Sequence, residues 1–428
     1  MMRRIGSNPV ALWSAFILVH LWLGIINLYG PGLPLGDVTI VYKFWSDQVF
    51  IGDFWVGIQS SWVYPILAIF PMIVSGLFGP AHYAGTWLTL ILLLDSAAFL
   101  VLIGWRRRAR HAAAAWWWIL FLALLGPIAL GRIDSVTVPL GIVGVLFIAT
   151  RPRVAAAMLT IAAWVKVWPA AIVGAMVIAV KERWAVLVTA VSVSAVIVAG
   201  ALAFGSGANV LSFITMQTDR GLQVESPIST VWLWMAFSRV PGTTLYYDQH
   251  LLTWQVTGDG VGVAGALMTP LMGLAVIAIV LVAVLAVRRG ASAAALMAPL
   301  SLALVCALIA FNKVGSPQFV SWLAVPIVLG LTTRREGHAR WFVVPAVLGA
   351  VTAALTQTIY PYLYGWLLGL HPLLLAALTV RNLLYFVLLG WAVAALWSLG
   401  RDDQDDVLPD AETAHPTRWP LGAAYKSR

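Results

Sequence analysis

Long apolar runs recur along almost the whole chain, and they limit its fold more than any other feature. Each run is roughly 17 to 26 residues long, enough for a helix to cross the hydrocarbon core of a bilayer, about 30 Å. The composition agrees, because 61% of the 428 residues are hydrophobic and only 10% are charged. In lipid, helices and closed barrels alone satisfy their own backbone groups. We therefore predict an all-α, polytopic membrane bundle.

The first run, from about Val10 to Leu28, is interpreted as the first membrane helix. It is longer than the apolar core of a secretory signal and is not followed by a small-residue cleavage site. The single cysteine, Cys306, lies inside another apolar run. The chain therefore has no internal disulfide and no cysteine-based metal or redox site.

The basic residues indicate which ends of the spans face the cytoplasm. A net charge of +9 would also suit a nucleic-acid partner, but most Lys and Arg residues fall in short connections between apolar runs. This distribution is typical of cytoplasmic loops. We therefore expect no nucleic-acid partner, and we expect both termini in the cytoplasm. The clusters are Arg3–Arg4, Arg106–Arg108 with Arg110, Arg151 and Arg153, Lys181 and Arg183, Arg288–Arg289, Arg334–Arg335 with Arg340, and the tail from Arg401.

This charge pattern predicts about ten full spans. Run 62–80 contains Pro65, Pro71 and Pro80, and it is expected to be re-entrant or interfacial. Run 154–180 begins and ends at basic clusters, so we expect two half-helices that meet at Lys166–Pro169. The expected spans are 10–28, 84–105, 113–130, 135–150, 184–204, 261–287, 291–310, 318–332, 341–359 and 374–399, and the expected outer segments are 30–61, 205–260 and 360–373.

We assign residues 1–400 to one transmembrane catalytic domain of this bundle. Residues 401–428 are rich in polar and charged side chains. Such a segment cannot bury enough apolar surface to fold by itself. We therefore expect a disordered cytoplasmic tail there.

Three charged residues are the main candidates for chemistry at the outer face. Asp37 stands where the first span returns to water, with a helix N-cap as the alternative role. Lys166 lies mid-run between Trp164 and Trp168, where a charge is costly and needs a partner. Lys313 lies at the end of a span, where snorkelling to the interface is the alternative. Two lysines at one depth suit an anionic phosphate, and a nearby carboxylate suits a general base.

Other polar residues are weighed against structural roles. Arg132 is a further candidate for binding a donor phosphate, and Asp134 for binding substrate, although the two could simply form a local salt bridge. We expect Asp47 and Asp53 to be solvated loop acids, and Asp95 to hydrogen-bond within the bundle. The remaining candidates for substrate binding are Tyr42, Tyr64, Glu225 and Gln318, and Arg381 could meet a phosphate or a lipid headgroup.

A phosphate held by lysines, with a carboxylate base beside it, describes glycosyl transfer from a polyprenyl-phosphate sugar. Such a donor carries its own activation, so the reaction needs no nucleotide and no glycine-rich phosphate loop, and the sequence has no such loop. We expect no cofactor and no metal site, while a requirement for a divalent cation stays open. The expected partners are the polyprenyl-phosphate sugar donor, a lipid-linked glycan acceptor and membrane lipids.

Several stretches of the chain resemble the GT-C superfamily of integral-membrane glycosyltransferases. The first combines Asp37, Tyr42, Gly52 and Tyr64–Pro65, and the others are GRIDSVTVPLGIVGVL (131–146), AAWVKVWPAAI (162–172) and FNKVGSPQFVSWLAVPI (311–327). Together they are most similar to glycosyltransferase family 87, the actinobacterial polyprenyl-phosphate-mannose-dependent mannosyltransferases. The last stretch is also similar to the eukaryotic transferases that add the first mannose of GPI anchors.

The resemblance implies a GT-C-type bundle and an inverting transfer, in which Asp37 takes the position of the catalytic base. Two departures from the family pattern stand out. Asp37 lacks the second acid of an Asp-x-Asp motif, which leaves metal use open. A histidine pair expected near 311–327 is replaced by Ser316, Pro317 and Gln318, which leaves the donor or acceptor open.

We therefore predict a multi-pass plasma-membrane glycosyltransferase. It moves a hexose, with mannose as the first candidate, from a polyprenyl monophosphate carrier to a lipid-linked glycan on the extracytoplasmic face. Three alternatives stay open: a transporter or flippase of a lipid-linked sugar, a non-catalytic scaffold, and a sister GT-C enzyme that uses arabinofuranose or glucose. A transporter should carry polar residues along a path through the bilayer, whereas the non-cytoplasmic charges here are expected to gather at one depth, with Asp95 as the exception.

Overall fold

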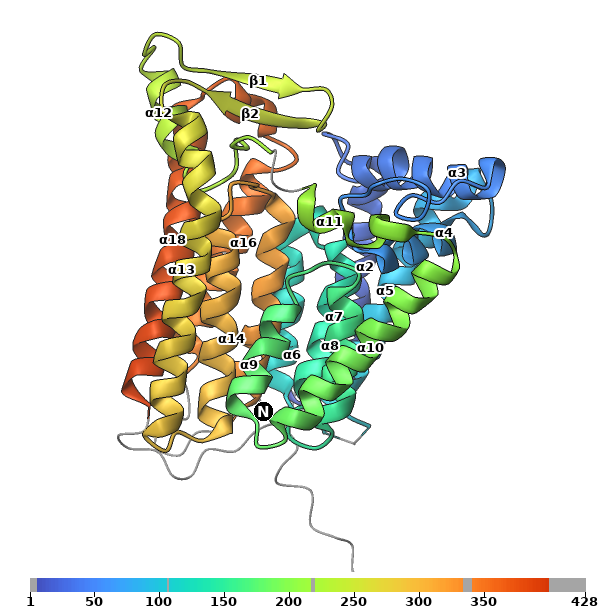
Figure 1. Cartoon of the computed structure of the whole chain (residues 1–428), viewed down its shortest axis with the longest axis vertical. Coiled ribbons are helices and arrows are strands. Elements are labelled where there is room, and N and C mark those ends of the chain that lie inside the picture. Colours follow the sequence, from blue (N-terminus) through green and yellow to red (C-terminus); the bar gives the residue numbers. More distant parts are fainter. Residues whose placement is uncertain (1–5, 106–107, 217–219, 334–340, 400–428) are drawn as a thin grey trace, which may run out of the picture.

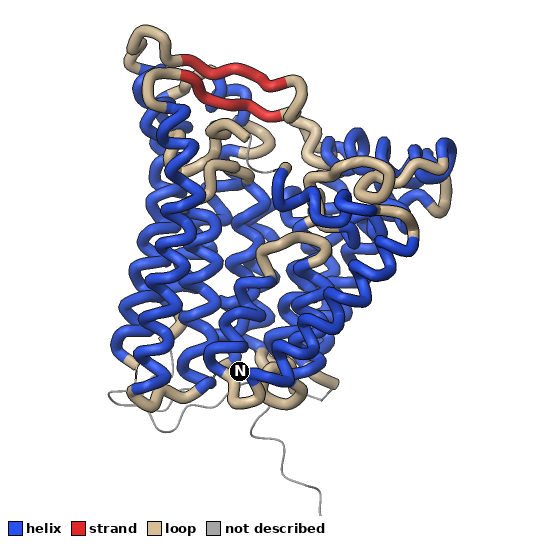
Figure 2. The backbone as a smooth tube through the Cα atoms, in the orientation of Figure 1, coloured by secondary structure: helices blue, strands red, loops and turns tan. Residues whose placement is uncertain are grey.

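The protein is a bundle of helices that carries a small antiparallel hairpin at one end. The computed structural model describes residues 6–105, 108–216, 220–333 and 341–399. Figure 1 shows the helices side by side, and Figure 2 shows the two strands together at one end. We call this end the hairpin end, and the other the opposite end. The helices that build the bundle are α2 (Pro9–Tyr29), α5 (Tyr83–Ile103), α6 (Ala112–Leu125), α7 (Asp134–Leu146), α8 (Pro152–Ala163), α9 (Ala170–Ala179), α10 (Arg183–Ala203), α13 (Val261–Arg288), α14 (Ala293–Ala310), α15 (Ala324–Thr332), α16 (Val343–Ile359) and α18 (Pro372–Ser398).

Seven helices of the described chain are long and apolar enough to cross a membrane. Their presence confirms the prediction of an all-α, polytopic membrane protein. The other three expected spans fall on shorter helices. These are α7 with 13 residues, α16 with 17 residues, and α15, which continues the short helix η6 (Pro317–Leu323).

Local sequence explains where several helices begin and end. The side chain of Asn8 accepts a hydrogen bond from the backbone N–H of Val10 and caps the start of α2. Ser292 caps α14 in the same way. Helix α5 ends at Gly104, whose φ of 69° is a conformation that favours glycine.

Burial separates central helices from those that face the surroundings. In α14, 89% of the most apolar stretch is buried inside the bundle, compared with 11% in α10 and 17% in α13. A surface helix of a water-soluble protein would place polar residues on its exposed face, but the exposed faces of α10 and α13 remain apolar. This pattern is the one expected for helices that contact lipid.

Helices α8 and α9 form the pair of half-helices predicted for run 154–180. They contain 12 and 10 residues, which corresponds to about 18 and 15 Å, roughly half of the hydrocarbon core. The connection 164–169 joins them and carries Lys166. Figure 1 shows that α9 meets α10 at the opposite end of the bundle. The connection that carries Lys166 therefore lies inside the bundle, away from the opposite end.

The hairpin end is built from short elements. Run 62–80 contains only a turn of 3-10 helix and the eight-residue α4, about 12 Å long and too short to cross a bilayer. Figure 1 places α3, α4, α11, α12 and both strands at this end. Their bounds are α3 (Lys43–Gly52), α4 (Ile69–Gly76), α11 (Ser212–Thr215), α12 (Thr230–Phe237), α17 (Tyr364–Leu368), β1 (Thr244–Asp248) and β2 (Thr253–Thr257).

The described basic connections lie at the opposite end. The backbone N–H of Ala109 donates to the carbonyl of Ser7, which places Ala109 beside the start of α2. Arg289 contacts the carbonyl of Trp397 near the end of α18. The predicted clusters Arg3–Arg4, Arg106–Arg107, Arg334–Arg340 and the tail 401–428 fall outside the described residues.

A second hydrophobic cluster fastens the hairpin to the bundle. Leu222 and Val224 flank β2, because the carbonyl of Leu222 accepts from Val256 and the N–H of Val224 donates to Trp254. The side chains of Leu222 and Val224 pack with Leu375 of α18 and other apolar residues of α13 and α16. The segment after α11 is therefore held between the hairpin and the bundle.

Candidate active site

Asp37 stands at the hairpin end, just after α2. It begins η1 (Asp37–Tyr42), a short π-helix that leads into α3. The preceding turn is packed against Pro361, since a Cβ on Gly32 would lie 2.9 Å from the carbonyl oxygen of Pro361. The Asp37 side chain remains 43% exposed, so a substrate can reach it.

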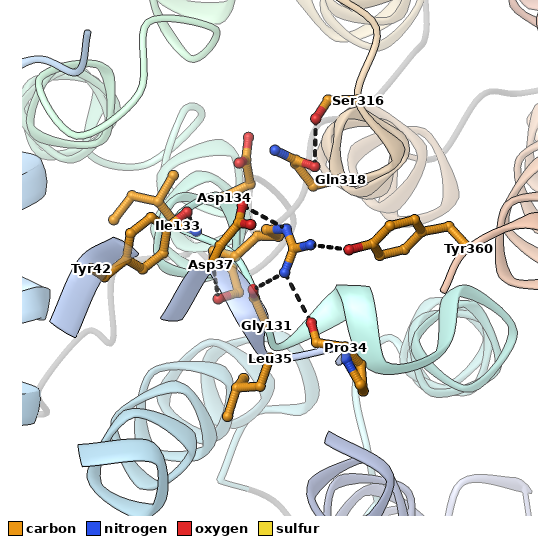
Figure 3. Close-up of polar contacts among 12 residues, drawn as sticks. Pro34, Leu35, Asp37, Tyr42, Gly131, Ile133, Asp134, Ser316, Gln318 and Tyr360 are labelled. Atoms are coloured by element: carbon orange, nitrogen blue, oxygen red, sulfur yellow. Dashed lines mark hydrogen bonds and ion pairs between the residues drawn. The ribbon is translucent and has the colours of Figure 1, made fainter. Parts of the chain in front are cut away.

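Arg132 fixes one oxygen of this carboxylate. Its Nε lies 3.1 Å from Asp37 Oδ2, and its Nη2 donates to the Tyr360 hydroxyl at 2.6 Å. Its Nη1 donates to the carbonyls of Pro34 and Gly131 (Figure 3). Burial disfavours the charge of Arg132, but Asp37 and Tyr360 outweigh this effect and the pKa of Arg132 is raised. The guanidinium is therefore a charged, buried support for Asp37.

Tyr42 contacts the turn that carries Arg132. It is buried, and its hydroxyl accepts a hydrogen bond from the backbone N–H of Ile133 at 3.3 Å. Burial, together with Tyr64 and Asp37, raises the pKa of Tyr42 well above its ordinary value. The sequence made Tyr42 a candidate for substrate binding. In the structure the side chain is enclosed and contacts the turn that carries Arg132, and binding of substrate by Tyr42 stays a prediction.

Asp134 and Lys166 form the neighbouring charge pair. Asp134 begins α7 and is buried; its Oδ1 accepts from Trp322 Nε1 at 2.6 Å, while its Oδ2 lies 3.9 Å from Lys166 Nζ. The ammonium also lies 4.6 Å above the Tyr64 ring. Asp134 was expected to bind substrate, but its burial makes it the counter-ion of Lys166. Lys166 itself is 18% exposed and has no hydrogen bond to the described residues.

Gln318 and Lys313 lie on the segment between α14 and α15. Gln318 belongs to η6, the short helix that also carries Trp322, and its Oε1 accepts from the Ser316 hydroxyl at 2.7 Å. The carbonyl of Lys313 accepts from the N–H of Gln223. The backbone of Lys313 therefore lies beside the 223–226 segment, and nothing in the described contacts joins it to Lys166.

Glu225 is committed to a buried ion pair. Arg381 of α18 donates from Nη1 to Glu225 Oε2 at 2.7 Å and from Nη2 to the Glu225 carbonyl at 2.8 Å. Burial raises the pKa of Glu225, and Arg381 offsets part of this effect. Glu225 was expected to meet the acceptor, and Arg381 a phosphate or a headgroup. In the structure the two residues pair with each other inside the protein, and their roles toward acceptor and phosphate stay predictions.

Of the other acids, Asp53 and Asp95 have the structural roles expected of them, whereas Asp47 lies within a helix and not in a loop. Asp47 pairs with Lys43 one helical turn away, at 2.5 Å on the surface of α3. Asp53 is exposed at the end of the same helix. Asp95 is buried, and His20 Nε2 lies 3.0 Å from its Oδ2, which links α5 to α2 within the bundle.

Three residues of the site were not found from the sequence. Tyr360 contacts Arg132, and Trp322 contacts Asp134, but both are aromatic residues near span ends, where a lipid-interface role is equally common. Arg220 lies in the segment before the hairpin, and its Nε is buried without a hydrogen-bond partner among the described residues. A lone arginine in a polar loop gives no sequence signal, and only its surroundings single it out.

The assembled site offers a half-exposed carboxylate beside cations. Asp37 with Arg132 and Asp134 with Lys166 form two ion pairs, and Arg132 and Asp134 lie two residues apart in the chain, which suits a base that acts next to a bound anion. Within the described residues, no group of three or more His, Cys, Asp or Glu side chains is placed to hold a metal ion.

Comparison with known proteins points to the same chemistry. The model of glycosyltransferase family 87 matches residues 62–312, more than half of the chain. The matched range includes Arg132, Asp134 and Lys166, whereas Asp37 precedes it. No curated protein and no solved structure matches the chain. The chain is a multi-pass membrane protein that belongs to glycosyltransferase family 87.

Proposed function

We propose that this glycosyltransferase moves a hexose, with mannose as the first candidate, from a polyprenyl-phosphate donor to a lipid-linked glycan. One observation carries the proposal: the reachable carboxylate of Asp37 is held by the buried Arg132, and two residues along the chain Asp134 forms a long ion pair with the partly exposed Lys166, so that the two pairs make a charged network at one turn. A lipid-phosphate donor needs a cation for its leaving group and a base for its acceptor, and this network supplies both.

We place the hairpin end on the extracytoplasmic face, with both termini in the cytoplasm. The positive-inside rule supports this orientation, because cytoplasmic loops carry an excess of Lys and Arg. Among the described residues, the basic connections of the opposite end contain Arg108, Arg110, Arg151, Arg153, Lys181, Arg183, Arg288 and Arg289.

In the proposed step, Asp37 removes the proton of an acceptor hydroxyl while its oxygen attacks the anomeric carbon of the donor. A new C–O bond forms on the face opposite the leaving group, so the configuration inverts. The bond between the anomeric carbon and the phosphate oxygen breaks, and its electron pair leaves with polyprenyl phosphate. The proton stays on Asp37 until it passes to water. A phosphate leaving group needs little protonation, which is consistent with a single reachable acid.

The contacts divide the roles of the cations. Lys166 is suited to bind the phosphate, because its side chain is partly exposed and its link to Asp134 is long, at 3.9 Å. Arg132 uses its nitrogens on Asp37, Tyr360 and backbone carbonyls, so we assign it to positioning the base. Lys313, Tyr64 and Gln318 remain candidates for contacts to the donor or the acceptor.

The test is a transfer assay on membranes with radiolabelled polyprenyl-phosphate mannose. Loss of the base in Asp37→Asn should lower turnover by about 10²-fold or more. Asp47→Asn is the matched control, since it removes an acid of the neighbouring helix that has its own lysine partner. We expect the control to retain wild-type turnover.

Equal turnover by Asp37→Asn and wild type would reject Asp37 as the base. Parallel donors carrying arabinofuranose or glucose identify the sugar. If wild type transfers none of the three sugars but moves a labelled donor across vesicles, the flippase alternative holds instead.

A further inference from the structure

Arg220 brings to the hairpin end a cation that has no acidic partner in the described part of the chain. Its Nε is buried and makes no hydrogen bond there. A buried guanidinium loses its hydration, and without a counter-ion that loss is not repaid. Burial accordingly lowers the pKa of Arg220, and Tyr64 offsets part of this effect.

Three other cations at the hairpin end, Arg132, Lys166 and Arg381, are each paired with an acid of the protein. Each has a carboxylate at ion-pair distance, so the protein itself neutralises them. The pairs are Arg132 with Asp37 at 3.1 Å, Lys166 with Asp134 at 3.9 Å, and Arg381 with Glu225 at 2.7 Å. Arg220 differs from all three, because no acid among the described residues pairs with it.

The segment that precedes Arg220 is anchored close to Tyr64 and Lys166. In α11, the Ser212 hydroxyl accepts from the N–H of Trp62 at 2.8 Å, two residues before Tyr64. The next ring, Phe213, lies 5.9 Å from Trp164, two residues before Lys166. The chain therefore leaves α11 beside the two stretches that carry the candidate phosphate site.

The segment that follows Arg220 is fixed by the hairpin. The Gly221 backbone lies directly against the amide end of the Gln255 side chain of β2, because a Cβ there would overlap Gln255 Oε1. The carbonyl of Leu222 then accepts from Val256 at 3.0 Å. The backbone after Arg220 is therefore fixed, and Arg220 lies near enough to Tyr64 for the two side chains to interact electrostatically, while the Tyr64 ring also lies 4.6 Å from the Lys166 ammonium.

We propose that Arg220 joins Lys166 beside Tyr64 to bind the phosphate of the lipid carrier. Arg220 supplies a positive charge that no acid among the described residues neutralises, and its planar guanidinium suits two phosphate oxygens at once. The inference rests on the proposed function, which makes a lipid phosphate the leaving group.

The phosphate carries more negative charge on the released carrier than on the intact donor. The intact donor is a phosphodiester with one negative charge, and the released carrier is a monoester with up to two. The attraction between Arg220 and the phosphate therefore increases when the bond to the sugar breaks. Arg220 thus stabilises the charge that develops on the leaving group. Arg220 should hold the spent carrier more strongly than the loaded one.

The experiment measures binding of polyprenyl phosphate and of polyprenol of equal length to the purified full chain in nanodiscs of neutral lipid. We expect wild type to prefer the phosphate. Arg220→Gln should weaken binding of the phosphate at least tenfold and leave binding of the alcohol unchanged. Arg239→Gln is the control, because Arg239 is an exposed arginine at the same end of the molecule. Arg220→Lys should bind with an intermediate affinity.

Two results would overturn the inference. One is equal affinity of wild type for the phosphate and the alcohol, which needs no variant and so does not depend on how Arg220→Gln folds. The other is a folded Arg220→Gln protein that binds the phosphate as tightly as wild type. Failure of the proposed function looks different: if wild type binds polyprenyl phosphate through Arg220 but transfers no hexose, the phosphate site stands and the reaction does not.

Discussion

At the scale of single residues, the site depends on side chains that never touch a substrate. Arg132 is enclosed, yet it determines where the Asp37 carboxylate points. Tyr360 in turn accepts a hydrogen bond from Arg132 at 2.6 Å. The reach of Asp37 toward an acceptor hydroxyl is therefore set two contacts away from the exposed surface.

This arrangement predicts a positioning role for Tyr360. Tyr360→Phe removes one acceptor of the charged Arg132, and a hydrogen bond to a charged group contributes about 1.5–3 kcal/mol. We expect kcat to fall roughly tenfold with little change in the KM for the donor, because the base is displaced while the phosphate site is kept. Steady-state kinetics check this split.

Tyr247→Phe is the control, since Tyr247 is an exposed tyrosine of β1. It should leave kcat and KM unchanged. A Tyr360→Phe enzyme that matches wild type in kcat would contradict the positioning role. A proportional loss of folded protein with normal kcat would reduce Tyr360 to a purely structural residue.

The sequence identified the charged members of the site better than it identified their roles. Asp37 and Lys166 stood out, because a charge in or beside an apolar run is costly and must have a reason. Tyr42 and Glu225 were assigned to substrate, but burial is a property of the fold, and the fold turns both inward. Arg220 was missed for the same reason, since its isolation exists only in three dimensions.

At the scale of elements, the 312–316 connection locks the hairpin end together. A Cβ on Gly315 would lie 1.9 Å from the backbone nitrogen of Ser226 and 2.2 Å from the carbonyl carbon of Glu225. The two segments are thus in backbone contact. This contact keeps the Glu225–Arg381 pair closed and the flank of Arg220 in place.

Gly315→Ala should therefore force these segments apart. Overpacking of this kind costs typically 1–3 kcal/mol. We expect a lower melting temperature in detergent and reduced transfer activity, measured by thermal unfolding and by the transfer assay. Gly174→Ala, on α9, is the control, because a Cβ there meets nothing within 4 Å. If both variants melt at the wild-type temperature, the close approach of the two segments is disproved.

Elements within the bilayer were easier to predict than those outside it. The half-helices α8 and α9 followed from a proline in mid-run and basic clusters at both ends, which one crossing could not satisfy. The strands β1 and β2 were not predicted, because a loop outside the lipid has no required hydropathy. Their pairing depends on contacts with the 222–224 segment, which sequence periodicity does not reveal.

At the scale of the whole molecule, the orientation in the membrane can be tested through the cysteine content. Cys306 is the single cysteine and is buried in α14, so Cys306→Ser gives a background without thiols. Gln249→Cys then marks the exposed turn of the hairpin, and Glu182→Cys marks the connection between α9 and α10. An impermeant maleimide on intact cells should label position 249 and leave position 182 unlabelled until the membrane is opened.

Labelling of position 182 alone on intact cells would reverse the orientation and move the proposed reaction to the cytoplasmic face. Labelling of neither position before the membrane is opened would indicate that the hairpin is not on the outer surface. In either case Asp37 would no longer face extracytoplasmic acceptors. The labelling therefore tests the compartment of the reaction independently of its chemistry.

The π-helix that begins at Asp37 makes the site sensitive to the number of residues as well as to their identity. A π-helical turn contains an extra residue compared with an α-helical turn. Deleting one residue between Asp37 and Tyr42 would let the segment relax to α-helical pitch and rotate Asp37 by about 100° around the axis. The carboxylate would then turn away from its guanidinium partner. Deleting one residue from this stretch should therefore abolish activity, whereas several conservative substitutions in the same stretch should not.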